Sequence, residues 1–74
     1  MNYIEIIDKI NEELNASGVK SIYTLIANNI DVTTIATLME KNTKEYNNLS
    51  KNQKDSLINY IKGLKLQSAV LLNF

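Results

Sequence analysis

The sequence predicts an all-α protein: a compact array of four short helices in a single domain spanning residues 1–74, with the middle two helices joined by a tight turn. Three observations support this prediction. Apolar residues recur at steps of three and four positions, which is the period of one face of an α-helix. Proline is absent and only two residues are glycine, so the turns of a β fold are poorly supplied. A chain of 74 residues also has the size of one small domain with one core.

The first helix is predicted over residues 3–16. Its apolar side chains are spaced by four, three and four positions and form one stripe, which consists of Tyr3, Ile7, Ile10 and Leu14. Gly18 then supplies the left-handed residue that ends a helix, and Val19 is placed to fold back on the last turn.

The second helix is short. It is predicted to bury Ile22, Leu25 and Ile26. It ends at Asn28 and Asn29, because asparagine tolerates the left-handed region better than most residues.

The third helix begins after Asp31, which is predicted to be an N-cap whose carboxylate accepts from the amide of Thr33 or Thr34. Ile30 and Ile35 stand where a hydrophobic staple would fix the direction of this helix. The helix runs to about residue 42, and its predicted buried residues are Ile35, Leu38 and Met39.

The last helix opens at Ser50, which forms a capping box, S-x-x-Q, with Gln53. Its apolar stripe consists of Leu57, Ile58, Ile61 and Leu64. Gly63 costs about 1 kcal/mol relative to alanine inside a helix, so a bend or a stop near it is one alternative. The polar segment 42–48 before this helix is either a loop or a frayed helical extension anchored by Tyr46.

The composition argues against catalysis. Cysteine and histidine are both absent, which removes disulfides, thiolate metal sites and the commonest general base. Ser17 with Lys20, and Ser50 with Lys54, are near in sequence but are explained by helix ends. We therefore predict no enzyme, no metal site and no cofactor. No apolar run is long enough to span a membrane, so a cytoplasmic protein is expected.

The net charge is zero, but the charges are unevenly distributed. Residues 1–40 carry six acidic residues and two lysines, whereas residues 41–74 carry six lysines and two acidic residues. Such asymmetry can orient a partner or favour a head-to-tail contact between two copies. The alternative is that both charged regions are simply solvated.

Residues 21–42 carry a pattern of turn, capping and apolar positions made of Asn29, Ile30, Asp31, Ile35 and Leu38. This pattern resembles the turn and recognition helix of Xre/Cro-type helix-turn-helix phage regulators. Residues 49–65 are similar to the helix that often follows the DNA-binding domain in phage-type repressors. The resemblance implies a helix-turn-helix-like middle pair.

The resemblance also implies binding to DNA as a dimer. The residues that would face DNA are Thr33, Thr34, Thr37, Lys41 and Lys44. Duplex binding depends mainly on lysine and arginine at phosphates, yet the chain has no arginine, and Asp31 and Glu40 at the two ends of this helix would repel phosphates. DNA binding is therefore the alternative function.

The favoured partner is another protein. The candidate interaction residues lie on the last helix and the apolar segment after it, and they are Tyr60, Leu64, Val70, Leu71, Leu72 and Phe74. The apolar segment either completes the core or pairs with a target protein or a second copy in a homodimer.

The favoured function is that of a small regulatory or inhibitory protein from a phage or mobile element, such as an antirepressor or an inhibitor of a host enzyme or defence complex. The excess of Ile, Asn, Lys and Tyr is typical of AT-rich bacterial or phage coding sequences. The capped, lysine-bearing last helix also resembles that of the bacteriocin immunity proteins, which are four-helix bundles. That resemblance implies a third alternative, an immunity function.

Overall fold

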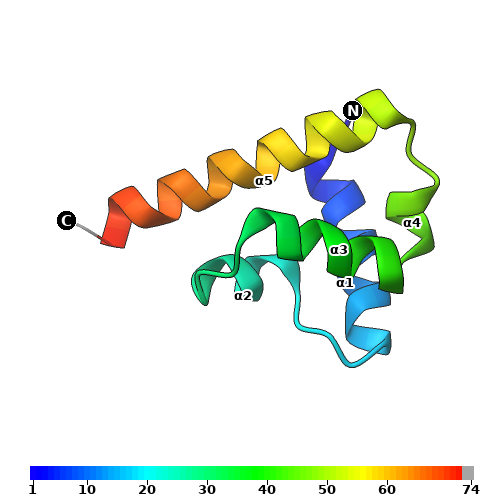
Figure 1. Cartoon of the computed structure of the whole chain (residues 1–74), viewed down its shortest axis with the longest axis horizontal. Helices are drawn as coiled ribbons and strands as arrows, with labels where there is room; N and C mark the ends of the chain where they lie inside the picture. Colours follow the sequence, from blue (N-terminus) through cyan, green and yellow to red (C-terminus); the bar gives the residue numbers. More distant parts are fainter. Residues whose placement is uncertain (73–74) are drawn as a thin grey trace.

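The computed structural model describes the backbone of residues 1–72 and the side chains of residues 1–69. This part of the chain is all-helical and contains five helices, which are α1 (Tyr3–Ala16), α2 (Ile22–Ala27), α3 (Val32–Asn42), α4 (Lys44–Asn47) and α5 (Lys51–Leu72). Helix α5 lies along one side of the molecule against α2 and α3, and its last turns project beyond them (Figure 1). None of the described helices is both long and apolar enough to cross a membrane.

Two tight turns have the backbone that the sequence predicts. Gly18 (φ 80°) follows α1, and the amide of Val19 donates to the carbonyl oxygen of Leu14 at 2.8 Å. Asn29 (φ 60°) follows α2, and the amide of Ile30 donates to the carbonyl oxygen of Leu25 at 3.0 Å. In both turns a left-handed residue lets the chain reverse and satisfies a carbonyl that the helix leaves free. Both predicted helix ends are confirmed.

The predicted cap of α3 is wrong in one respect. Asp31 has the extended backbone of an N-cap, but its carboxylate accepts no capping hydrogen bond. Asp31 is exposed, so water can solvate both the carboxylate and the first amides of the helix.

At α5 the predicted capping box is confirmed. The amide of Ser50 donates to Oε1 of Gln53 at 2.9 Å, and the amide of Gln53 donates to Oγ of Ser50 at 3.2 Å.

Helix α4 occupies the polar segment that the sequence leaves ambiguous, and it makes the helix count five rather than four. The carboxylate of Glu13 on α1 accepts hydrogen bonds from the amides of Lys44 and Glu45, both at 3.0 Å. Thr43, the N-cap residue, makes no capping bond, because its buried hydroxyl donates to the carbonyl oxygen of Met39 at 2.7 Å. A carboxylate from another helix therefore supplies the cap of α4.

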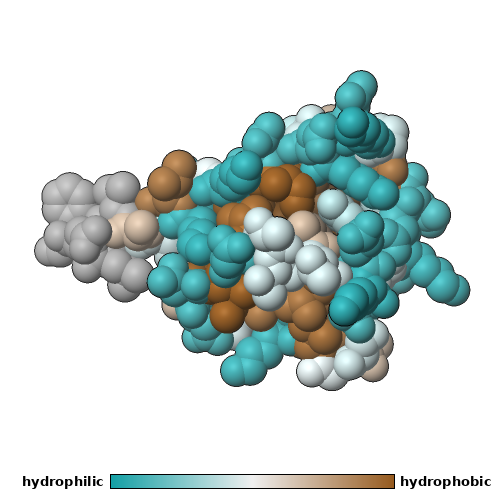
Figure 2. Space-filling view, viewed as in Figure 1, coloured by the Kyte–Doolittle hydropathy of each residue, from teal (hydrophilic) through white to brown (hydrophobic). Residues whose placement is uncertain are grey.

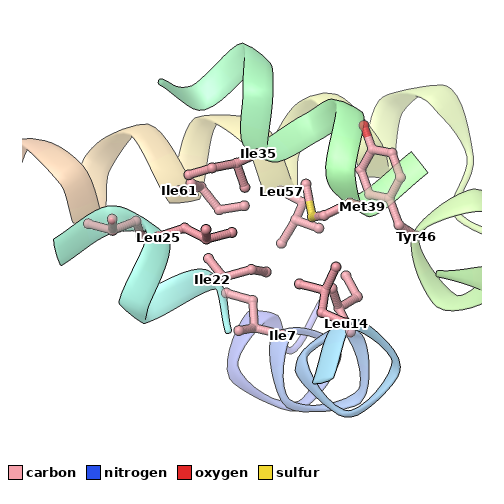
Figure 3. Close-up of a cluster of buried hydrophobic side chains, with 11 residues drawn as sticks. Ile7, Leu14, Ile22, Leu25, Ile35, Met39, Tyr46, Leu57 and Ile61 are labelled. Carbon is pink, nitrogen blue, oxygen red and sulfur yellow. The ribbon is translucent and has the colours of Figure 1, made fainter. Parts of the chain in front are cut away.

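The core lies where α1, α2, α3 and α5 meet, with Tyr46 of α4 closing one end (Figure 3). Its buried apolar residues are Ile7, Ile10, Leu14, Ile22, Leu25, Ile26, Ile35, Met39, Tyr46, Leu57 and Ile61. Three residues predicted to be buried, Leu38, Ile58 and Leu64, are half-buried at its edge. Helix α5 continues through Gly63 without a stop.

Candidate protein-binding surface

A pair of stacked aromatic rings joins the start of α1 to the middle of α5. The ring centroids of Tyr3 and Tyr60 are 4.6 Å apart, and the ring planes differ by 10°. Both side chains are half-buried and pack against the edge of the core. Each ring therefore keeps part of its surface in solvent while the stack holds its orientation.

Tyr23 lies on α2, which packs against α5, the helix that carries Tyr60. Partial burial raises the pKa of the Tyr23 phenol, and the charges of Asp8 and Tyr60 raise it further. The side chain of Tyr23 is 44% exposed. Three of the four tyrosines of the chain thus lie on α1, α2 and α5.

Two aliphatic side chains extend this aromatic surface. Ile4 on α1 is 60% exposed. Leu64 follows Tyr60 by four positions on α5, so both lie on the same side of that helix, and Leu64 is half-buried. We call the surface formed by Tyr3, Ile4, Tyr23, Tyr60 and Leu64 the tyrosine surface. Ile4 and Tyr23 do not belong to the core cluster or to the partly buried side chains around it.

The opposite side of α5 borders a shallow groove of about 330 Å³. The described residues that line it are Val32, Lys62, Lys65, Leu66 and Ala69, and we call it the lysine groove. Leu66 is 68% exposed. Nζ of Lys65 donates to the carbonyl oxygen of Ile30 at 2.9 Å, so this side chain runs across the groove to the turn between α2 and α3. Figure 2 shows apolar surface between α5 and α3.

The residues predicted for DNA contact divide into two groups. Thr33, Thr34 and Thr37 are exposed on α3, where the hydroxyl of Thr37 donates to the carbonyl oxygen of Thr33 at 3.0 Å. Lys41 and Lys44 line a hollow of about 430 Å³ that also contains Glu13. The lysines therefore lie beside a carboxylate, and the five residues do not form one uniformly basic surface.

The structure places only some of the predicted protein-interaction residues. Tyr60 and Leu64 lie in the tyrosine surface, whereas the side chains of Val70, Leu71, Leu72 and Phe74 fall outside the described residues. The sequence pattern assigns Tyr3 to the core, and it does not single out Ile4 or Tyr23. The one available signal for Tyr23 is its place next to the buried Ile22, one position off the apolar stripe of α2.

The tyrosine surface presents aromatic rings, phenol hydroxyls and aliphatic side chains. Among the described residues, no three acidic, histidine or cysteine side chains lie close enough to hold a metal ion. Exposed rings with polar hydroxyls and adjacent aliphatic groups suit contact with another protein surface. No protein-family model, curated protein or solved structure matches the chain.

Proposed function

We propose that this chain is a small regulatory or inhibitory protein that acts by binding another protein through the tyrosine surface. The observation that carries the proposal is the exposed aromatic patch made by the Tyr3–Tyr60 stack and Tyr23. An antirepressor, or an inhibitor of a host enzyme or defence complex, in a phage or mobile element fits this description.

Binding to a partner costs conformational entropy because side chains at the interface become ordered. Tyrosine offers a large contact area with few rotatable bonds, and it is enriched among the residues that dominate interface energies. The Tyr3–Tyr60 stack orders two rings before any partner arrives, which lowers the entropy lost on association. Tyr23 and Ile4 lie outside the core cluster, so their apolar area remains available to a partner.

A photo-crosslinking residue at position 23 tests this proposal. The full chain would carry the crosslinker in place of Tyr23 and be irradiated in an extract of the native host. A matched protein would carry the same group in place of Thr37, which is exposed on α3. We expect one protein to be captured at position 23 and not at position 37.

Affinity measurements on the captured protein then test whether it binds the tyrosine surface. Tyr23→Ala should weaken binding at least tenfold, while Thr37→Ala should leave it within twofold, because only Tyr23 lies in the tyrosine surface. Equal capture at both positions, or unchanged affinity for Tyr23→Ala, would overturn the proposal. Circular dichroism of each variant separates loss of contact from loss of fold.

A second candidate is a DNA-binding regulator that acts as a dimer through a helix-turn-helix-like α2–α3 pair. What favours it is the left-handed Asn29 between two short helices, with Thr33, Thr34 and Thr37 exposed on the second one. Fluorescence anisotropy with labelled duplex DNA tests it. Micromolar affinity that falls steeply with salt, and is lost when Lys41 and Lys44 are changed to Glu, would favour this candidate over protein binding.

A further inference from the structure

We propose that two copies of this chain associate head to tail, with the acidic side of α1 from one copy in the lysine groove of the next. The inference does not depend on the proposed function. It rests on one exposed apolar side chain flanked by carboxylates, and on an apolar groove flanked by ammonium groups.

The first surface lies on α1. Ile4 is 60% exposed and is followed at helical spacing by Asp8 and Glu12, which are also exposed. Glu5 lies beside them and is 4.0 Å from Lys9. We call this set of Ile4, Glu5, Asp8 and Glu12 the acidic face. It is an amphipathic helix surface with an excess of negative charge.

The second surface is the lysine groove. Leu66, Val32 and Ala69 supply its apolar lining, and Lys62 and Lys65 place ammonium groups along it. None of the described residues that line the groove is acidic. The groove therefore matches the acidic face in both respects: apolar surface meets apolar surface, and lysines meet carboxylates.

These opposite charges are not paired within one molecule. Across the side chains that the structure describes, the only ion pair is that of Lys9 with Glu5, within α1 itself. No carboxylate of α1 reaches a lysine of α5 there. Asp8 and Glu12 of the first helix and Lys62 of the last, all exposed, therefore remain available for a contact between copies.

The positions of the two surfaces determine the kind of assembly. The start of α1 lies beside the first half of α5, whereas the groove lies on the last turns of α5, which project from the other side of the molecule (Figure 1). One copy therefore presents both surfaces to different neighbours. Such a heterologous contact extends into chains of copies unless a rotation closes it into a ring.

A complementation experiment tests this geometry. Ile4→Lys replaces the apolar side chain of the acidic face by a positive charge, and Leu66→Asp places a negative charge in the groove; both side chains are exposed, so each variant should fold. Sedimentation velocity should show that the wild-type weight-average mass rises with concentration. Each variant alone should remain a monomer at concentrations where the wild type associates. An equimolar mixture keeps one intact groove and one intact acidic face, so it should form a dimer that does not grow.

Two controls, a substitution outside both surfaces and a change in salt concentration, test whether these surfaces and their charges cause the association. Thr37→Asp adds a charge at an exposed site of α3 that belongs to neither surface, and it should associate as the wild type does. Raising salt from low values to about 0.5 M should weaken association at least tenfold, because exposed charge pairs are screened. A wild type that stays monomeric up to roughly 1 mM, where an association near −4 kcal/mol would be detected, would overturn the inference. So would a mixture of the two variants that remains monomeric.

The result also separates this inference from protein binding. Ile4 belongs to both the acidic face and the tyrosine surface, but Leu66 belongs only to the lysine groove. If Leu66→Asp abolishes self-association and leaves the crosslink at position 23 unchanged, the two surfaces act independently. Failure of association alone leaves the proposed protein partner standing.

Discussion

Lys65 of α5 holds the turn between α2 and α3, because its Nζ donates to the carbonyl oxygen of Ile30 at 2.9 Å. The two residues are 35 positions apart in the chain. Ile30 directly follows Asn29, the left-handed residue of the turn. The last helix therefore fixes the turn from which α3 starts.

Replacing Lys65 by Met should lower the free energy of unfolding by about 1 kcal/mol. Met keeps most of the apolar stem but cannot donate, so the partly buried carbonyl of Ile30 loses its side-chain partner. Urea unfolding followed by circular dichroism measures the change. Lys62→Met is the matched control, because Lys62 lies one turn earlier, is exposed and should change stability by less than about 0.5 kcal/mol. Equal effects of the two variants would contradict a role for the Lys65 bond.

Replacing Glu13 by Ala should destabilise the protein by about 1–2 kcal/mol and expose the α4 segment. The carboxylate caps two amides at the start of α4, and Thr43 cannot replace it because its hydroxyl is engaged elsewhere. Hydrogen exchange at the amides of Lys44 and Glu45 should accelerate strongly. Glu12→Ala removes an exposed carboxylate that does not contact the amides of α4, so it should leave these exchange rates unchanged.

Stability should fall at alkaline pH because of Tyr46. Burial raises the pKa of this phenol above its ordinary value of 10.0, and the carboxylates of Glu40 and Asp55 raise it further. The stability that the raised pKa of Tyr46 contributes is fully present below the pKa of this phenol in the unfolded chain. It is lost as the pH rises through the pKa of the phenol in the folded protein. Tyr23, with its own raised pKa, adds to this effect in the same direction.

Tyr46→Phe isolates the contribution of Tyr46. Phe keeps the buried ring but cannot ionise, so the loss of stability above pH 10 should become smaller while stability near pH 7 stays similar. Urea midpoints across this pH range, together with phenolate absorbance, measure both quantities. An unchanged alkaline profile would mean that other groups cause the loss.

The two glycines should respond to alanine in opposite directions. Gly63 lies inside α5 in ordinary helical backbone, and an added Cβ would meet no atom within 4 Å, so Gly63→Ala should stabilise the fold by about 0.5–1 kcal/mol. Gly18 has φ 80°, a conformation that costs an L residue about 1–2 kcal/mol, so Gly18→Ala should destabilise it. Thermal unfolding of the two variants provides the comparison. A destabilising Gly63→Ala would indicate that α5 needs flexibility at this position.

Local sequence determines the helices and most of their ends. Three- and four-residue spacing predicts the buried stripe of Ile7, Ile10 and Leu14, and the conformational tolerance of glycine and asparagine predicts the turns at Gly18 and Asn29. The Ser50–Gln53 capping box is predicted in the same way. These features depend on residues within a few positions of one another, so their physics can be recognised from the sequence alone.

Only the tertiary structure decided the features that join distant segments. Helix α4 forms where the carboxylate of Glu13, 31 positions away from Lys44, satisfies its first amides. The Tyr3–Tyr60 stack joins α1 to α5, although the spacing of Tyr3 indicates only a core residue. The packing angles of the helices set these contacts, and local residue preferences do not encode those angles. The sequence therefore determined an all-helical domain with correctly placed turns, while long-range packing created the tyrosine surface and the lysine groove.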